Sequence, residues 1–292
     1  MGHLQPFPYD PSISIEISQK CVACGACVNV CPMGTLSFDT NDSKSRQPMI
    51  FDSSICICCG QCIAVCPTDA ISNNHLSLSD FISIDSTPQI DWDEYVALTR
   101  QRRSVRCFSS IPVPKELITK ILDESTRYAP TGDNRQAVEI LLIDGDRLQI
   151  IRAEMIALMV RLHNLLKYTY WISSILGRLW RNMQAWKRAI DLGMDPSTRN
   201  ASLLMLFITD NRVKESEVDA AILSYQTLLS AEILGVKSCY LGALVNLLPF
   251  SRKLKKILHL PKHQQAVCGL LLGYTKTRYR KLVSRKPLKL IQ

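Results

Sequence analysis

The 292-residue sequence lacks any segment that could cross a bilayer, because no uncharged apolar run approaches the roughly 20 residues that a spanning helix needs. Its first residues, MGHLQPFPYDPSISIE, contain no basic stretch followed by an apolar one and therefore predict no secretory signal. No G-x-G-x-x-G motif follows an expected strand, so nothing indicates a separate dinucleotide-binding domain. These absences favour a cytoplasmic protein.

Signatures of nucleic-acid binding are also missing. The chain has a formal net charge of +9, but it contains no zinc-finger, basic-helix or RNA-binding motif, so we expect no nucleic-acid partner. A basic surface without such motifs instead attracts anionic cofactors and acidic redox partners.

The cysteines are too unevenly placed for a disulfide framework. Nine of the twelve lie between Cys21 and Cys66, whereas bridges would be spread along the chain. Clustered thiols of this kind favour metal ligation in a reducing compartment.

Two of the cysteine-rich stretches form an internal repeat. CVACGACVNVCP (21–32) and CICCGQCIAVCP (56–67) share the pattern C-x2-C-x2-C-x3-C-P. Closely spaced thiolates suit iron–sulfur iron, and a zinc ribbon would need two pairs of ligands rather than two runs of four. Cys58 aligns with Ala23, where no ligand is needed, so we predict a free thiol there.

The repeat resembles the two-cluster bacterial ferredoxins, in which the fourth cysteine of each run ligates the other cluster. This resemblance implies two [4Fe–4S] clusters with crossed ligand sets. One set would be Cys21, Cys24, Cys27 and Cys66, and the other would be Cys56, Cys59, Cys62 and Cys31.

The chain changes character after the repeat. Residues 72–89 are polar and Ser-rich and predict a linker between a domain at 1–85 and a second domain at 86–292. In the second part, the apolar spacing in 114–129 and 218–235 predicts two helices, the latter ended by Gly235. Three short apolar runs have the length of strands, although each could also be buried helix: 137–143, 203–209 and 267–273. We therefore expect a mixed α+β domain.

Two segments near the start of this domain carry candidate binding groups. The first places several cationic forks and a hydroxyl within five residues, which suits a phosphate or an anionic ring edge: Arg102, Arg103, Ser104 and Arg106. Taken alone, such a cluster is more often a solvated basic face. The second, APTGDNRQ, is a turn-rich loop that offers a hydroxyl and two amides: Thr131, Asn134 and Gln136.

The two segments together resemble the nitroreductase family of FMN enzymes, with its R-R-S-x-R-x-F and P-[ST]-x-x-N-x-Q motifs. The similarity covers about 91–290 and includes LGVKSCYLGAL (234–244) and the basic segment 272–290. With the N-terminal repeat, the chain resembles the ferredoxin-fused nitroreductases of anaerobes. This implies a ferredoxin-like domain followed by an α+β domain with a central, mainly antiparallel sheet, and a homodimer.

The resemblance also implies roles for individual residues. Arg102, Arg103, Ser104 and Arg106 would contact the FMN phosphate, ribityl chain and N1/C2-carbonyl edge, and Arg106 would stabilise anionic reduced flavin. Thr131, Asn134 and Gln136 would lie along the flavin, Gly242 would bring backbone near the ring, and Arg285 would complete the phosphate site. Tyr240 stands where the family commonly has Trp, and no Pro-Trp follows Gln136; both departures concern the substrate pocket.

The segment 152–190 combines an apolar stripe with arginines on the opposite side. The stripe follows 4-3-4-3 spacing: Ile172, Leu176, Leu179, Met183 and Trp186. Such a helix can lie on a membrane surface, but we favour a lid or a dimer-packing helix. Its aromatic residues indicate a bulky apolar substrate: Tyr168, Tyr170, Trp171, Trp180 and Trp186. We expect His163 to be a surface residue and not a ligand.

The leading functional hypothesis is an FMN-dependent oxidoreductase. A low-potential donor, such as a ferredoxin, would supply electrons through the two clusters, and a nitroaromatic, an enone or a similar organic acceptor would receive them. No catalytic side-chain acid is identifiable. Two alternatives stay open: a flavin/iron–sulfur redox sensor or electron-transfer protein without a substrate, and an NAD(P)H-dependent nitroreductase.

Overall fold

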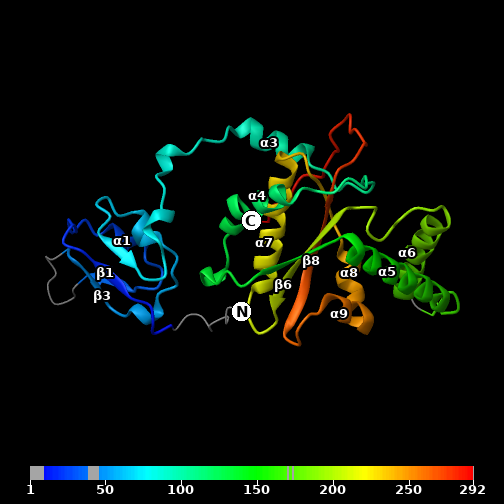
Figure 1. The fold of residues 1–292 in the computed structure, drawn as a ribbon, viewed down its shortest axis with the longest axis horizontal. Coiled ribbons are helices and arrows are strands. Elements are labelled where there is room, and N and C mark those ends of the chain that lie inside the picture. Colours follow the sequence, from blue (N-terminus) through cyan, green and yellow to red (C-terminus); the bar gives the residue numbers. More distant parts are fainter. Residues whose placement is uncertain (1–9, 39–45, 170, 173, 292) are drawn as a thin grey trace. The chain divides into compact units, whose positions relative to one another are not determined.

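The computed structural model describes residues 10–38, 46–169, 171–172 and 174–291 (Figure 1). The chain forms two compact units. Unit 1 comprises Met1–Ile90 together with the loop Thr131–Gln136, and unit 2 comprises Asp91–Pro130 and Ala137–Gln292. The division at 85/86 stays a prediction, and the structure groups residues 86–90 with unit 1.

Unit 1 consists of two short antiparallel ladders and two short helices. Its elements are β1 (Ile15–Ile17) paired with β4 (Ile71–Asn73), β2 (Leu36–Phe38) paired with β3 (Pro48–Ile50), α1 (Ala26–Val30) and α2 (Gln61–Ala64). A small core holds the ladders and helices together: Ile13, Ile15, Cys27, Leu36, Ile63 and Ile71. The expected linker begins inside β4 and continues with two single 3₁₀ turns, at 78–80 and 84–86.

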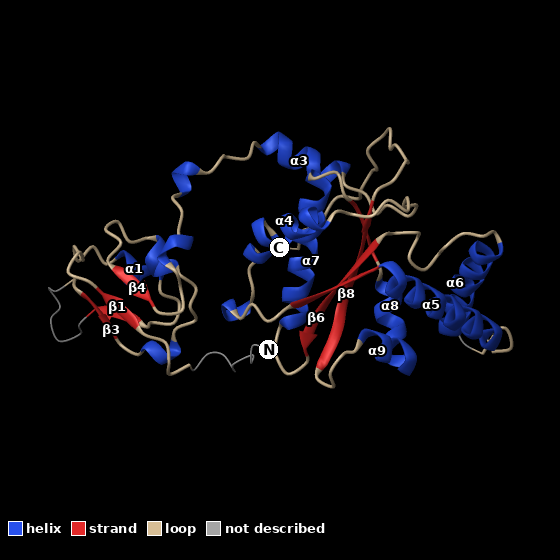
Figure 2. Cartoon of the chain, in the orientation of Figure 1, coloured by secondary structure: helices blue, strands red, loops and turns tan. Residues whose placement is uncertain are grey.

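Unit 2 is built on one four-stranded sheet with the order β5-β6-β8-β7, and every neighbouring pair is antiparallel (Figure 2). The strands are β5 (Glu139–Asp144), β6 (Leu203–Asp210), β7 (Lys237–Tyr240) and β8 (Gln264–Gly273). The three apolar runs for which the sequence allowed strand or buried helix are therefore strands β5, β6 and β8.

Both faces of this sheet are covered. Every residue of β6 is buried, and its side chains alternate between two cores. Leu204 and Leu206 pack with α5 (Gly145–Leu166), α8 (Gly242–Leu247) and α9 (Arg252–Leu258) in the first core. In the second core, Met205 and Phe207 pack with α4 (Lys115–Glu124) and α7 (Ser216–Ile233). Burial on both faces explains why the β6 sequence is continuously apolar rather than alternating.

The predicted helices are confirmed, with ends set by local hydrogen bonds. Pro114 is the N-cap of α4, which ends at Glu124 because the Thr126 hydroxyl donates to the Ile121 carbonyl at 3.0 Å and a 3₁₀ turn follows. Gly235 follows α7 with a φ of +76°, the left-handed conformation expected at this end. α3 (Trp92–Gln101) opens unit 2.

The middle segment folds as α5 and α6 (Ser174–Asp191). Met183 is buried and Trp180 and Trp186 pack against the first core, whereas Ile172 is 60% exposed. Tyr170 and the side chain of Leu176 lie outside the described residues. His163 is half-buried and stacks on Trp180 at 4.7 Å between ring centroids. Among the described residues, no helix has the length and apolar character that crossing a membrane requires.

Candidate cluster and cofactor sites

The two cysteine runs have the same backbone conformation. Gly25 and Gly60 are the N-caps of α1 and α2, with φ of 76° and 72°. Two residues earlier, Ala23 and Cys58 are also left-handed, with φ of 55° and 47°. The sequence repeat is therefore a structural repeat, and Cys58 stands at a position that the first run fills with an alanine.

A Cβ at either helix-capping glycine would also meet an aromatic side chain. A Cβ at Gly25 would stand 2.7 Å from Cζ of Phe38, and a Cβ at Gly60 would stand 2.9 Å from Cζ of Phe81. Real Cβ atoms do not approach other atoms so closely. Each cysteine run thus lies beneath one aromatic ring of unit 1.

The second predicted ligand set converges on one cavity. Five thiols line it, and four of them are the predicted ligands from both runs: Cys31, Cys56, Cys59 and Cys62. In the first set, Cys21 and Cys24 lie close enough to affect the pKa of Cys27, which is raised by burial and then by these thiols. The placement of Cys66 beside them stays a prediction. Among the described residues, no three His, Cys, Asp or Glu side chains surround a point suited to a single metal ion.

Backbone N–H groups point at the cysteine sulfurs in both runs. The amides of Ala23 and Cys58 lie 3.5 and 3.4 Å from Sγ of Cys21 and Cys56 respectively. Such N–H···S bonds stabilise thiolate sulfur and help to set the potential of an iron–sulfur cluster.

The fourth cysteine of each run has a pKa below its ordinary value. Burial raises the pKa of Cys31, but N–H groups of Leu36 and Met33 outweigh that effect. The pKa of Cys66 is likewise lowered, since the N–H groups of Ala70 and Thr68 outweigh burial, and the Ala70 amide lies 3.2 Å from its Sγ. Both positions favour thiolate, the form that ligates iron. The donor sets therefore fit two clusters.

Cys58 lines the same cavity without being needed as a ligand. Burial, followed by the neighbouring Cys56 thiol, raises the pKa of Cys58 to about 11. Burial raises the pKa of the predicted ligand Cys62 to about 11 as well, so acidity does not separate ligand from bystander here. The amide of Asn73 lies 3.7 Å from Sγ of Cys56 and 3.9 Å from that of Cys58. The assignment of Cys58 as a free thiol thus rests on its alignment with Ala23.

In unit 2, the arginine segment is fixed by backbone hydrogen bonds to three distant parts of the chain. Val105 N–H donates to the Ser238 carbonyl at 2.9 Å, at the start of β7. Phe108 N–H donates to the Arg199 carbonyl at 3.1 Å, and Ser109 N–H donates to the Tyr274 carbonyl at 2.7 Å. Arg102 to Arg106 consequently occupy a defined position beside the sheet.

The arginines of this segment point to two different places. Burial raises the pKa of the Cys239 thiol on β7, and the positive charges of Arg199, Arg106 and Arg102 oppose that rise. These three cations therefore lie close enough to Cys239 for their charges to act on its thiol. Arg103 instead lines a separate basic pocket, where its Nη1 donates to the carbonyls of Arg100 and Arg102 and its buried Nε has no partner among the described residues.

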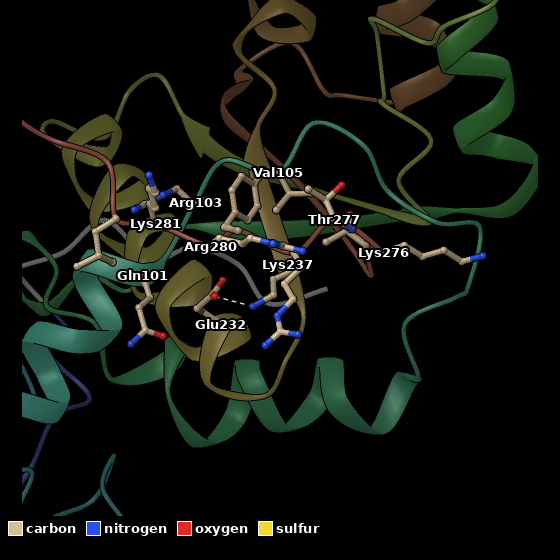
Figure 3. Close-up of a pocket in the computed structure, with 13 residues that line it drawn as sticks. Gln101, Arg103, Val105, Glu232, Lys237, Lys276, Thr277, Arg280 and Lys281 are labelled. Carbon is tan, nitrogen blue, oxygen red and sulfur yellow. Dashed lines mark hydrogen bonds and ion pairs between the residues drawn. The ribbon is translucent and has the colours of Figure 1, made fainter.

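The basic pocket has a volume of about 600 Å³ and is formed by the end of α3, the start of β7 and the segment after β8 (Figure 3). Glu232 pairs with Lys237 at 2.6 Å inside it. Most of its other charged side chains are cationic: Arg103, Lys276, Arg278, Arg280 and Lys281. An orphaned guanidinium N–H beside excess positive charge fits an anionic group such as a phosphate.

The remaining predicted flavin contacts are distributed as follows. Arg285 is exposed and does not line the basic pocket. Gly242 begins α8, and a Cβ there would meet no atom within 4 Å, so there is open space above it. That space belongs to an apolar cavity of about 760 Å³ between α5, α6 and α8, which Met183 and Trp186 also line.

The amide-bearing loop lies in unit 1. Asn134 donates both amide hydrogens, to the carbonyls of Ile57 at 3.1 Å and Cys58 at 3.0 Å, in the turn between two predicted cluster ligands. Its Oδ1 accepts from Gln136 Nε2, and Gln136 N–H donates to the Thr131 hydroxyl oxygen. The structure thus joins these three residues to one another and to the second cysteine run. Their shared role with the unit 2 arginines stays a proposal.

Several basic residues near these sites were not identified individually from the sequence, among them Arg199, Lys237 and Arg280. Arg199 lies in MDPSTRN, which has the composition of an ordinary turn, and only its backbone contact with Phe108 reveals its position. Arg280 follows the motif that carried the resemblance, and a count of basic residues between 272 and 290 could have found it.

A model of the nitroreductase family matches residues 99–274, more than half of the sequence. This chain belongs to the nitroreductase family. A model of a 4Fe-4S dicluster domain matches residues 20–70. The predicted combination of a two-cluster domain and a nitroreductase domain is therefore confirmed, as is the prediction of an oxidoreductase.

Individual relatives agree with this assignment. A 4-nitrobenzoate reductase from Pseudomonas putida is 27% identical over 202 residues, which cover 62% of this family member and 86% of that relative. The FMN-bound nitroreductase from Desulfitobacterium hafniense has a TM-score of 0.52 at 22% identity and covers 68% of this chain and 97% of its own. The FMN-bound nitroreductase from Bacteroides fragilis has a TM-score of 0.50 at 18% identity, covering 68% and 99%. These likenesses confirm the predicted α+β fold.

Proposed function

We propose that this chain is an FMN-dependent oxidoreductase that receives electrons through two [4Fe–4S] clusters and reduces a small organic acceptor. The observation that carries the proposal is the occurrence of both donor sets on one chain: cysteines of both runs at one cavity in unit 1 and a group of cations that form no ion pair among the described residues in unit 2. Bound FMN would accept single electrons and deliver two to the acceptor.

The residues of the chain supply binding and electrostatics. Arg102, Ser104 and Arg106 hold the anionic parts of the cofactor, and a cation near the N1 edge favours the anionic reduced form. Arg103 and Arg285 serve the phosphate, Gly242 leaves room for the ring, and Thr131, Asn134 and Gln136 lie along it. Asn134 also bonds to the cysteine turn of unit 1.

The acceptor is an apolar aromatic or unsaturated compound. The cavity beside Gly242 is lined mainly by apolar side chains, among them Leu162, Met183 and Phe250. A volume of about 760 Å³ lies in the range of pockets that bind drug-sized ligands. The relative named 4-nitrobenzoate reductase supports a nitroaromatic as the first compound to test.

The donor is a low-potential protein such as a ferredoxin, in a reducing, cytoplasmic compartment suited to clustered thiols.

The protein acts as a homodimer. α7 exposes an apolar row, which includes Val218 at 58% and Tyr225 at 46%, and the row lines a groove with Ile222 and Leu229. A row on one helix can pack against its own copy across a two-fold axis. Sedimentation of wild type and Ile222→Glu, expected as dimer and monomer, tests this assembly.

Anaerobic purification followed by iron, sulfide and flavin analysis tests the cofactor content. We expect about eight irons, from four per cubane, and one FMN per chain. An acceptor screen with reduced ferredoxin then tests the activity: turnover of nitroaromatic or enone compounds is expected. Cluster reduction that changes partner affinity without any turnover would replace the enzyme by the redox sensor.

A double variant separates the cluster-fed enzyme from the NAD(P)H-dependent alternative. Cys56→Ala/Cys59→Ala should lose the second cluster and with it ferredoxin-driven reduction of the flavin. Anaerobic stopped flow should show no bleaching of its flavin by NADPH. Rapid bleaching in this variant would establish direct use of the nicotinamide.

A further inference from the structure

The cations around Cys239 include one that does not belong to the arginine segment. Arg199 lies in the loop between α6 and β6, and its carbonyl accepts the N–H of Phe108 at 3.1 Å. The arginine segment is therefore joined to β7 through Ser104 and Val105, and the adjoining Phe108 is joined to the Arg199 loop. No described carboxylate forms an ion pair with Arg102, Arg106 or Arg199, so the group of three carries an unbalanced positive charge.

The Arg199 backbone is held in a costly conformation. Arg199 and Asn200 have φ of 56° and 60°, and this left-handed conformation costs about 1–2 kcal/mol for an arginine, whereas asparagine adopts it more readily. Consecutive residues of this kind persist only where the surroundings fix them, and they cluster at ligand-binding segments. The loop thus has a defined shape that ordinary turn chemistry does not require.

One buried carboxylate fixes this shape. The side chain of Asp195 is fully buried and accepts hydrogen bonds from backbone and hydroxyl donors of the loop: Ser197 N–H and Oγ, Thr198 N–H at 3.1 Å and Oγ1 at 2.6 Å, and Asn200 N–H at 3.0 Å. Arg152 on α5 pairs with it at 3.2 Å. Burial alone would raise the pKa of Asp195, but these bonds and the Arg152 charge hold it below its ordinary value.

We propose that Arg199 is a third cation of the anionic cofactor site, acting with Arg102 and Arg106, and that Asp195 positions it. The inference rests on the proposed FMN function and adds a binding residue from outside the arginine motif. The shared chemistry is recognition of an anion by guanidinium, and the anion is either the phosphate or the charged edge of the reduced ring.

Arg199→Asn is the principal test, because asparagine tolerates the left-handed backbone while the guanidinium is lost. The full chain is purified anaerobically with its clusters, stripped of flavin, and titrated with FMN while flavin fluorescence is followed. We expect the dissociation constant to rise at least about 10-fold, the loss typical of a charge-assisted hydrogen bond. Arg199→Lys should recover part of the affinity, and the surface control Arg252→Asn should match wild type.

Riboflavin distinguishes the two anions. A loss confined to FMN assigns Arg199 to the phosphate. A loss for both ligands, with a more negative midpoint potential of the bound flavin, assigns it to the ring edge. Wild-type affinity and potential in Arg199→Asn, while Arg102→Gln binds FMN weakly, would overturn the inference. Wild-type binding in both Arg102→Gln and Arg106→Gln would instead overturn the proposed flavin site itself.

The positioning role of Asp195 is tested by a double-variant cycle. Asp195→Asn should weaken FMN binding, and Asp195→Asn/Arg199→Asn should bind no more weakly than Arg199→Asn alone, since Asp195 acts through Arg199. An additive loss would show that Asp195 supports the site by another route. If Asp195→Asn fails to fold, Arg152→Gln replaces it in the cycle. This variant removes the partly exposed ion-pair partner of Asp195 and leaves the hydrogen bonds of Asp195 to the loop in place.

Discussion

Gly60→Ala should destabilise the cluster domain more than its backbone conformation alone can explain. The residue has a φ of +72°, where any side chain other than glycine costs about 1–2 kcal/mol. Its new Cβ would also stand 2.9 Å from Phe81 Cζ, and overpacking of this kind costs about 1–3 kcal/mol more. The total of about 2–5 kcal/mol combines strain and contact.

A matched control separates these two contributions. Gly34 lies in the same unit with a φ of +67°, but a Cβ there would meet nothing within 4 Å. Gly34→Ala should therefore show only the strain, about 1–2 kcal/mol or roughly a 5–30-fold change in an equilibrium constant. In Gly60→Ala/Phe81→Ala the contact is removed, so the two substitutions should cost less together than the sum of their separate effects.

Because cluster loss makes unfolding irreversible, the assay compares rates. Anaerobic protein is placed in a fixed urea concentration, and the decay of the visible iron–sulfur absorption is followed. We expect the order wild type, Gly34→Ala, Gly60→Ala from slowest to fastest. Equal rates for the two glycine variants would refute the packing argument, and a strictly additive double variant would show that Phe81 is not the clashing group.

Three further predictions concern other parts of the chain. Cys58→Ala should keep about eight irons per chain. Cys31→Ala removes a predicted ligand from the shared cavity and should keep about four irons or fewer, and iron analysis distinguishes the two variants. Lys253→Met should destabilise unit 2 by about 1–2 kcal/mol, because it leaves the buried Glu154 carboxylate without its partner at 2.6 Å. Faster unfolding in a fixed urea concentration measures the loss, and Lys253→Arg should unfold at the wild-type rate. Folding lowers the pKa of Asp195, so its contribution to stability is fully present above the unfolded pKa of about 3.9 and is lost as the pH falls through the folded pKa. Below about pH 4, the stability of Asp195→Asn should therefore fall less steeply with pH than that of wild type. Acid denaturation measures this, and the same pH dependence in both proteins would contradict it.

The sequence predicted those features that follow from local spacing. The cysteine repeat gave matching turns and helices, and the apolar runs gave β5, β6 and β8. Spacing alone did not decide between strand and buried helix for β6, because a strand covered on both faces loses its alternation. The pairing partners of each strand settle that question, and they lie far away in the sequence.

The site was predicted less completely, for a similar reason. The arginine motif located Arg102 and Arg106, but the alternation of an extended segment sends Arg103 to a different pocket. Arg199 is joined to the arginine segment by the backbone hydrogen bond between its carbonyl and the Phe108 N–H, and no local sequence pattern predicts that bond. Asn134 was expected along a flavin, and its bonds to Ile57 and Cys58 could not be inferred from the turn-rich loop that carries it.

The crossing of cysteines between the two runs makes them interdependent. Cys31 belongs to the first run yet lines the cavity of the second, so under the predicted ligand assignment neither run completes its own cluster. A chain in which only one run has folded therefore has no complete site to load. Loading of either cluster should therefore require that both runs have folded, even in a variant that keeps only one of the two clusters.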